Sequence, residues 1–171
     1  MEQFERIERV PLAITPTPIE AVPRFAEQLG GPEIYIKRDD NTGLALGGNK
    51  ARKLEYLMAE AKAQGADDVL TEGGLQSNHA RMTAAAACKL GMKAVLVLKG
   101  EEIKEYQGNL MIDKLLDAEI MVVNPDLDRR QAMYDKAEEL KESGLKPYVI
   151  PTGGSTGLGA LGFVRCAKEI V

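Results

Sequence analysis

The sequence has little of the chemistry that marks several large classes of protein. It holds two cysteines and one histidine in 171 residues, and Cys88 and Cys166 stand far apart without the spacing of metal ligands. This scarcity excludes a disulfide framework and a cysteine-built metal site, so we expect no metal. It also favours a reducing, cytoplasmic location.

Long runs of one kind of residue are missing as well. No apolar stretch is long enough to cross a membrane, and the first residues, Met-Glu-Gln-Phe-Glu-Arg, lack the apolar segment of a signal peptide. The net charge of −4 is spread over both signs without a long basic run. We therefore expect neither a membrane nor a nucleic acid as a partner.

What the sequence does have is an alternation of short apolar runs with helical patterns. The runs that we interpret as strands are residues 33–37, 69–71, 94–98, 120–123 and 148–150, and the helical patterns are residues 49–64, 78–90, 107–116, 129–142 and 158–171. Gly65, Gly91 and Gly144 stand where helices commonly end. This order predicts an α/β fold, in which an open, twisted parallel sheet carries helices on both faces in three αβα layers.

One glycine turn combines a predicted helix start with an unusual cluster of charge. It reads Gly47-Gly48-Asn49-Lys50-Ala51-Arg52-Lys53-Leu54-Glu55. A helix N-terminus favours acidic neighbours, yet Lys50, Arg52 and Lys53 lie in or beside this first turn. A broken local rule at such a turn indicates a functional site, and a lysine beside other cations is a better amine nucleophile. A solvated basic turn explains the same charges.

Two other loops follow predicted strands and lead into predicted helices, where ligands of open parallel sheets bind. In Gly73-Gly74-Leu75-Gln76-Ser77-Asn78-His79, either Ser77 or Asn78 is a suitable N-cap, and the free backbone N–H groups would suit a carboxylate or phosphate. His79, the one histidine, suits a structural role or the site. In the loop that begins at Gly153, Gly157, Gly159 and Gly162 match a dinucleotide-binding pattern, which close helix packing also explains.

At Gly-Gly-Asn-Lys-x-Arg-Lys-Leu-Glu and Gln-Ser-Asn-His, the sequence resembles the D-cysteine desulfhydrase and 1-aminocyclopropane-1-carboxylate deaminase family. These pyridoxal 5'-phosphate enzymes have the tryptophan-synthase-β-like fold, fold type II. The resemblance implies that Lys50 forms the Schiff base with the cofactor, that Asn78 binds its 3-hydroxyl, and that Asn49 helps to fix the lysine loop. It further implies that Ser77, Asn78 and His79 contact the substrate, with Ser77 receiving the carboxylate.

The resemblance also implies a reaction, namely α,β-elimination from a small amino acid. D-cysteine, which would give pyruvate, sulfide and ammonia, is favoured because His79 stands where deaminases of the family have glutamine. The 1-aminocyclopropane-1-carboxylate deaminase reaction and an L-cysteate sulfo-lyase reaction are the alternatives.

Family members are roughly twice as long as this chain, as two-domain proteins commonly are. We therefore expect a truncated fold: residues 1–48 form an arm and strand of the large domain, residues 49–152 form the small cofactor-facing domain, and residues 153–171 begin the large domain. A homodimer, or a missing C-terminal half, is the expected partner. The alternative from another class is a catalytically inactive truncated domain.

Overall fold

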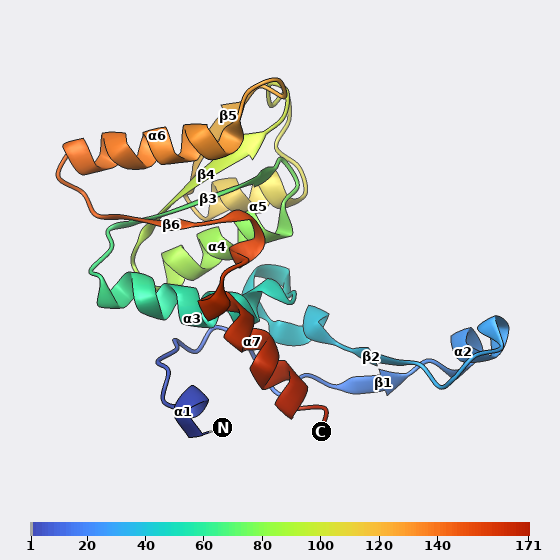
Figure 1. The fold of residues 1–171 in the computed structure, drawn as a ribbon. Coiled ribbons are helices and arrows are strands. Elements are labelled where there is room, and N and C mark those ends of the chain that lie inside the picture. Colours follow the sequence, from blue (N-terminus) through green and yellow to red (C-terminus); the bar gives the residue numbers. More distant parts are fainter. Residues whose placement is uncertain (1) are drawn as a thin grey trace.

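The computed structural model describes residues 2–171 (Figure 1). The helices are α1 (Glu2–Glu5), α2 (Pro23–Leu29), α3 (Lys50–Ala63), α4 (Asn78–Lys89), α5 (Asn109–Leu115), α6 (Arg129–Glu142) and α7 (Gly157–Lys168). The strands are β1 (Ile19–Ala21), β2 (Tyr35–Lys37), β3 (Asp68–Gly74), β4 (Lys93–Lys99), β5 (Glu119–Val123) and β6 (Pro147–Ile150), and the short 3₁₀ turns are η1 (Asp39–Thr42), η2 (Leu44–Leu46) and η3 (Thr152–Gly154).

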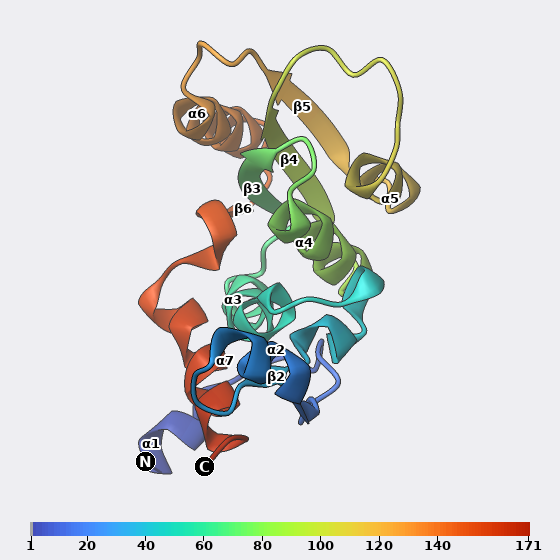
Figure 2. The same cartoon turned by 90° about the vertical axis from the view of Figure 1, so that its right-hand side faces the viewer.

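The central sheet is parallel and has the strand order β5-β4-β3-β6. The chain steps from β3 to β4 to β5 through α4 and α5 on one face, and it returns through α6 on the other face to place β6 beside β3 (Figures 1 and 2). The predicted α/β fold with helices on both faces is confirmed. Since the strand order reverses between β3 and β6, the carboxyl ends of these two strands form the topological switch point at which such sheets bind ligands.

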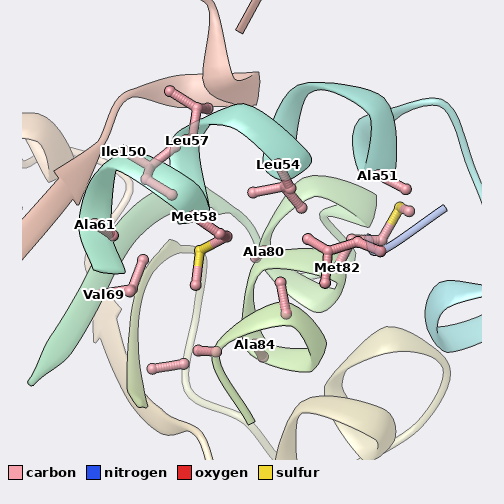
Figure 3. Packing of buried hydrophobic residues seen from close by; sticks show 14 of the residues in the cluster. Ala51, Leu54, Leu57, Met58, Ala61, Val69, Ala80, Met82, Ala84 and Ile150 are labelled. Atoms are coloured by element: carbon pink, nitrogen blue, oxygen red, sulfur yellow. The ribbon is translucent and has the colours of Figure 1, made fainter. Parts of the chain in front are cut away.

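Apolar residues on both faces of the sheet form the core. On one face, α3 packs its Leu54, Leu57 and Met58 against a helix α4 rich in small side chains, among them Ala80 and Ala84 (Figure 3). On the other face, α6 covers the sheet with Met133, Ala137 and Leu140. Each fully buried side chain of Leu size contributes about 1.5–3 kcal/mol, so the two layers hold the loops at the sheet edge in fixed positions.

Helix α7 crosses α3 at very short range. A Cβ added at Gly162 would lie 2.3 Å from the carbonyl oxygen of Arg52, and one added at Gly159 would lie 2.3 Å from that of Gly154. Close packing therefore accounts for two of the three glycines that match the dinucleotide pattern, and β3, not the strand before α7, is the first strand of the sheet.

The region before the glycine turn differs from the prediction in one respect. We expected residues 33–37 to form a half-buried strand, but β2 pairs only with β1, in a separate antiparallel ribbon that extends away from the body (Figure 1). Ile36 is 48% exposed, because no helix layer covers this two-stranded ribbon. The prediction was wrong for burial because alternation in sequence cannot tell which face finds a neighbour. Within residues 2–171, no helix has the length and apolar character needed to cross a membrane.

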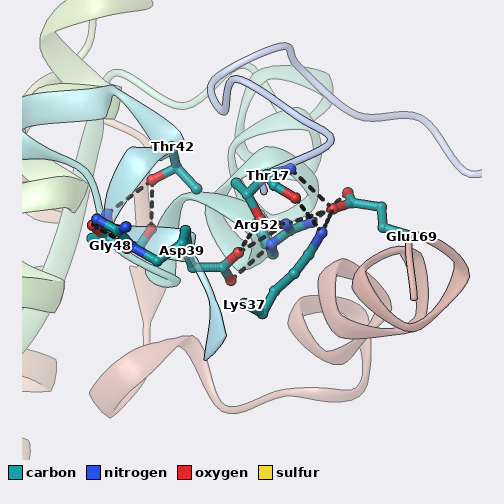
Figure 4. A network of polar contacts seen from close by, with 9 residues as sticks. Thr17, Lys37, Asp39, Thr42, Gly48, Arg52 and Glu169 are labelled. Carbon is teal, nitrogen blue, oxygen red and sulfur yellow. Dashed lines mark hydrogen bonds and ion pairs between the residues drawn. The ribbon is translucent and has the colours of Figure 1, made fainter. Parts of the chain in front are cut away.

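A buried ion network ties the start of the chain to its end (Figure 4). The guanidinium of Arg52 contacts the carboxylates of Asp39 at 2.9 Å and Glu169 at 2.7 Å, and Lys37 lies 2.7 Å from Glu169. Hydrogen bonds from Arg52 lower the pKa of Glu169 to about 2. The network fixes α3, which begins at Lys50, against both α7 and the segment that precedes the glycine turn.

Candidate active site

The glycine turn that precedes Lys50 is held by hydrogen bonds from the backbone N–H of Gly48. Gly48 donates its N–H to Thr42 Oγ1 at 2.8 Å and to the carbonyl of Asp39 at 3.0 Å. Gly47 has φ of +74° and Gly48 φ of +134°, and a Cβ on Gly47 would lie 1.8 Å from the carbonyl oxygen of Asp40. Only glycine fits this turn, which therefore delivers Lys50 to a fixed position as the first residue of α3.

Residues Asn49 and Lys50 begin α3 as expected. Asn49 occupies the N-cap position, but its side chain makes no capping hydrogen bond. The Lys50 amine lies against η3, since a Cβ on Gly153 would be 3.4 Å from Lys50 Nζ. The Lys50 amine makes no hydrogen bond or ion pair with any part of the chain that the structure describes.

A second lysine of α3 fastens η3. Lys53 Nζ donates to the carbonyl of Gly153 at 3.1 Å and to Ser155 Oγ at 3.3 Å. Burial and the charge of Lys50 lower the pKa of Lys53. The two ammonium groups make this edge of the sheet strongly positive.

His79 is buried beside the two lysines. It is 4% exposed, and a Cβ on Gly154 would lie 3.4 Å from His79 Cε1. Burial, followed by the charges of Lys50 and Lys53, lowers the pKa of His79 to about 4. The imidazole is therefore neutral at pH near 7, with one N–H donor and one acceptor nitrogen, and neither nitrogen has a partner among residues 2–171.

The loop between β3 and α4 positions Ser77 and Asn78. Of the two N-cap candidates, Ser77 is the one used, and its Oγ accepts from the N–H of Ala80 at 3.2 Å. Asn78 is exposed, and its Oδ1 accepts from Arg81 Nη1 and from Asn109 Nδ2, each at 3.0 Å. Its amide nitrogen makes no hydrogen bond within the described chain.

The tertiary structure thus gathers the residues singled out in the sequence at one edge of the sheet. Lys50 and His79 lie together at η3, which follows β6, and Ser77 and Asn78 stand at the carboxyl end of β3. These are the two strands that flank the topological switch point. The same edge therefore holds a free amine, a buried neutral imidazole, an unpaired amide N–H and the N-terminus of α4.

Two residues that the sequence interpretation missed hold this edge in place. Glu72 is buried in β3 and accepts from Thr152 Oγ1 at 2.5 Å and from Arg129 Nε at 2.7 Å. Burial alone would raise the pKa of Glu72, but the bonds from Thr152 and Arg129 outweigh it and lower the pKa. Arg81, on a helix rich in small side chains, joins the Lys50 loop to Asn78. A charged residue within an apolar strand or helix was the available signal for both.

Comparison with known proteins identifies the family. Residues 10–171 match the model of the pyridoxal-phosphate dependent enzyme family. The chain is 46% identical over 175 residues to a D-cysteine desulfhydrase of Serratia proteamaculans, covering 99% of this chain and 52% of the relative. It is 44% identical over 180 residues to a 1-aminocyclopropane-1-carboxylate deaminase of Rhizobium leguminosarum, covering 99% of this chain and 53% of the relative.

Solved structures agree. The crystal structure of an ACC deaminase homologue superposes with a TM-score of 0.91 at 45% identity, over 99% of this chain and 52% of that one. Diaminopropionate ammonia lyase of Escherichia coli shares the fold, with a TM-score of 0.66 at 19% identity, over 98% of this chain and 55% of that one. The chain spans about half the length of the curated relatives it matches. The resemblance drawn from the two sequence motifs is thereby confirmed, and the chain belongs to the pyridoxal-phosphate dependent enzyme family.

Proposed function

We propose that this chain supplies the lysine-bearing half of the active site of a pyridoxal phosphate-dependent lyase. The observation that carries the proposal is the Lys50 amine, which is free of hydrogen bonds in the described chain and lies within the electrostatic reach of a buried, neutral His79. A buried histidine with neither nitrogen paired is costly for stability, so its place beside the free amine supports a ligand there.

The residues at this edge fit the family's cofactor. Gly153 leaves open the space that a Cβ would fill 3.4 Å from the Lys50 amine. Asn78 offers an unpaired amide N–H, which suits a phenolic oxygen, and the two unpaired nitrogens of His79 suit a polar group. Lys50 would hold the cofactor covalently through its amine, and Asn78 would hold it by hydrogen bonding, with Asn49 shaping the loop.

When bound, the cofactor supplies an electron sink for carbanion chemistry, and the protein supplies orientation and proton transfer. In its free form, the Lys50 amine would take the proton from the α-carbon of the substrate and, in elimination from D-cysteine, deliver it to the departing sulfur. Ser77 and the N–H groups at the start of α4 receive the substrate carboxylate. The neutral imidazole of His79 donates one hydrogen bond to the substrate without adding a third positive charge beside Lys50 and Lys53.

For the whole protein we propose α,β-elimination from D-cysteine with water, giving pyruvate, sulfide and ammonia. His79 is the residue that favours this reaction, since the resemblance associates glutamine at this position with the deaminases. Opening of 1-aminocyclopropane-1-carboxylate is the second candidate, supported by the relative of that name at 44% identity. On the basis of the family resemblance, we also propose that residues 49–152 form a small cofactor-facing domain and that residues 1–48 and 153–171 belong to a large one. The whole protein would be a homodimer.

The test is borohydride reduction of the chain with added pyridoxal phosphate, followed by peptide mapping. We expect the label on Lys50, and its loss in Lys50→Ala. Lys62→Ala, which removes an exposed lysine of the same helix, is the matched control and should keep the label. Label shared equally among surface lysines would refute the proposal.

The choice of substrate is tested separately with D-cysteine and 1-aminocyclopropane-1-carboxylate. Sulfide release from D-cysteine that survives in Lys50→Ala would contradict the role of Lys50. A preference for the cyclopropane substrate would replace the first reaction with the second, and His79→Gln is expected to move the preference in that direction.

A further inference from the structure

A single guanidinium connects three segments around the candidate active site. Arg81, which is 6% exposed, donates from Nη1 to Asn78 Oδ1 at 3.0 Å and to Asn109 Oδ1 at 2.8 Å. It donates from Nη2 to the carbonyl of Gly47 at 2.9 Å. The three partners belong to the start of α4, the start of α5 and the turn before Lys50.

Stability alone does not explain this burial. Arginine is rarely buried unless it is paired with a carboxylate, yet all three hydrogen-bond acceptors of Arg81 are neutral. Asp113 on α5 is the carboxylate that faces it, but within residues 2–171 neither carboxylate oxygen of Asp113 nor Arg81 Nε has a hydrogen-bond partner. Burial lowers the pKa of Arg81 and raises that of Asp113 to about 7. A buried cation held in this way points to a role beyond packing.

The chemistry of arginine fixes the orientation of the Asn78 amide. A guanidinium has donors only, so the amide atom of Asn78 that faces Arg81 must be the oxygen. The same argument turns Asn109 Oδ1 toward Arg81, which leaves Asn109 Nδ2 to donate to Asn78 Oδ1 at 3.0 Å and to the carbonyl of Gln76 at 2.8 Å. Because Asn78 Oδ1 already accepts two hydrogen bonds, Asn78 can present only its N–H groups to a ligand.

We propose that Arg81 is a positioning residue, which sets the donor orientation of Asn78 and the place of the Lys50 turn through its bonds to Asn78, Asn109 and Gly47. The inference rests on the proposed function, because it is Asn78 that would meet the phenolic oxygen of the cofactor. An N–H directed at that oxygen stabilises its deprotonated form. Loss of the orientation should therefore raise the pH at which the visible absorption band of the bound cofactor changes, by about one to two pH units.

The first test is a pH titration of that band in the cofactor-loaded chain. We expect Arg81→Met to keep the borohydride label on Lys50 but to move the midpoint upward, and Arg81→Lys, which can replace only part of the bonding, to fall between. The charged groups that face the site are Lys50 and Lys53 of α3 and Asp113 of α5, with His79 of α4 neutral. The titration is repeated in an Asp113→Asn background, so that the carboxyl with a pKa of about 7 does not contribute.

Arg52→Lys is the matched control. Arg52 is also buried, at 2% exposed, but its guanidinium bonds to the carboxylates of Asp39 and Glu169. We expect this variant to lose stability without moving the midpoint. If Arg81→Met does not fold, Asn109→Ala removes the other donor to Asn78 Oδ1 and should give a smaller upward movement. An unchanged midpoint in every folded variant of Arg81 and Asn109 would overturn the inference.

The second test needs no cofactor. The side-chain amide resonances of Asn78 in the ¹⁵N-labelled free chain should shift and broaden in the Arg81 variants and stay in place in Arg52→Lys. Unchanged Asn78 resonances would overturn the inference. This measurement also separates the two proposals. A chain that takes no cofactor on Lys50 refutes the proposed function. The link between Arg81 and Asn78 is then decided by these resonances alone.

Discussion

Replacing His79 by glutamine should reduce the loss in free energy of unfolding that the chain undergoes as the pH falls. In the folded chain, burial and the charges of Lys50 and Lys53 lower the pKa of His79 from 6.5 to about 4. As the pH falls below 6.5, the unfolded chain binds a proton at this residue that the folded chain does not bind. The free energy of unfolding therefore decreases through this range, and the decrease is complete only below about pH 4.

The size of the effect follows from the two pKa values. At pH near 7, protonation of His79 changes the free energy of unfolding by close to zero. At about pH 5 it lowers the free energy of unfolding by about 2 kcal/mol. Glutamine has no titrating group, so the variant should lose about 2 kcal/mol less than the original chain over this interval. His79 is the only histidine, and carboxylates contribute to both proteins, so the difference isolates this residue.

Urea unfolding of both proteins at about pH 7 and about pH 5, followed by circular dichroism, measures the effect as a change in the free energy of unfolding. Any constant cost of burying glutamine cancels, because only the dependence on pH is compared. If the two proteins lose the same stability on acidification, His79 is not buried beside two cations, and the electrostatic description of the site fails.

Three other predictions concern the elements around the site. Burial raises the pKa of Asp113 to about 7, so the folded chain holds a proton that the unfolded chain releases above about pH 4. Asp113→Asn should therefore gain stability over the original chain as the pH rises from about 5 to about 8, as measured by urea unfolding; a constant difference would contradict this. Gly162→Ala would place a Cβ 2.3 Å from the carbonyl oxygen of Arg52 and should cost about 1–3 kcal/mol, whereas Gly157→Ala, with no atom within 4 Å, should cost much less. Arg52→Met should cost about 3–5 kcal/mol and raise the pKa of Glu169 from about 2, visible by NMR; an unmoved carboxyl would show that the pair does not interact.

Much of the fold was predictable because the signals are local. The helix ends at Gly65, Gly91 and Gly144 all have positive φ, as the C-terminal glycines of helices require. Ser77 caps α4 through a bond to a residue three positions away. Periodicity gave α6 its observed bounds, because a helix that covers a sheet must repeat its apolar residues every three or four positions.

The site was only partly predictable. The sequence singled out Lys50, Ser77, Asn78 and His79, whose roles toward the cofactor and substrate remain predictions. It did not indicate Arg81, whose partner Gly47 is 34 positions away, or Glu72, whose partner Thr152 is 80 positions away. A hydrogen bond between distant segments leaves no periodic pattern, because it depends on how the helices pack.

The sequence by itself determined the alternation of strands and helices, the glycine turn before Lys50 and a helix cap at Ser77 or Asn78, since these depend on conformational preferences of neighbouring residues. The tertiary structure alone decided that β6 lies beside β3 and that β2 leaves the sheet to pair with β1. The first of these pairings sets Gly153 against the Lys50 amine. It also buries the imidazole of His79, which stays uncharged at pH near 7. Strand order depends on which apolar faces can be buried together, and that competition involves the whole chain.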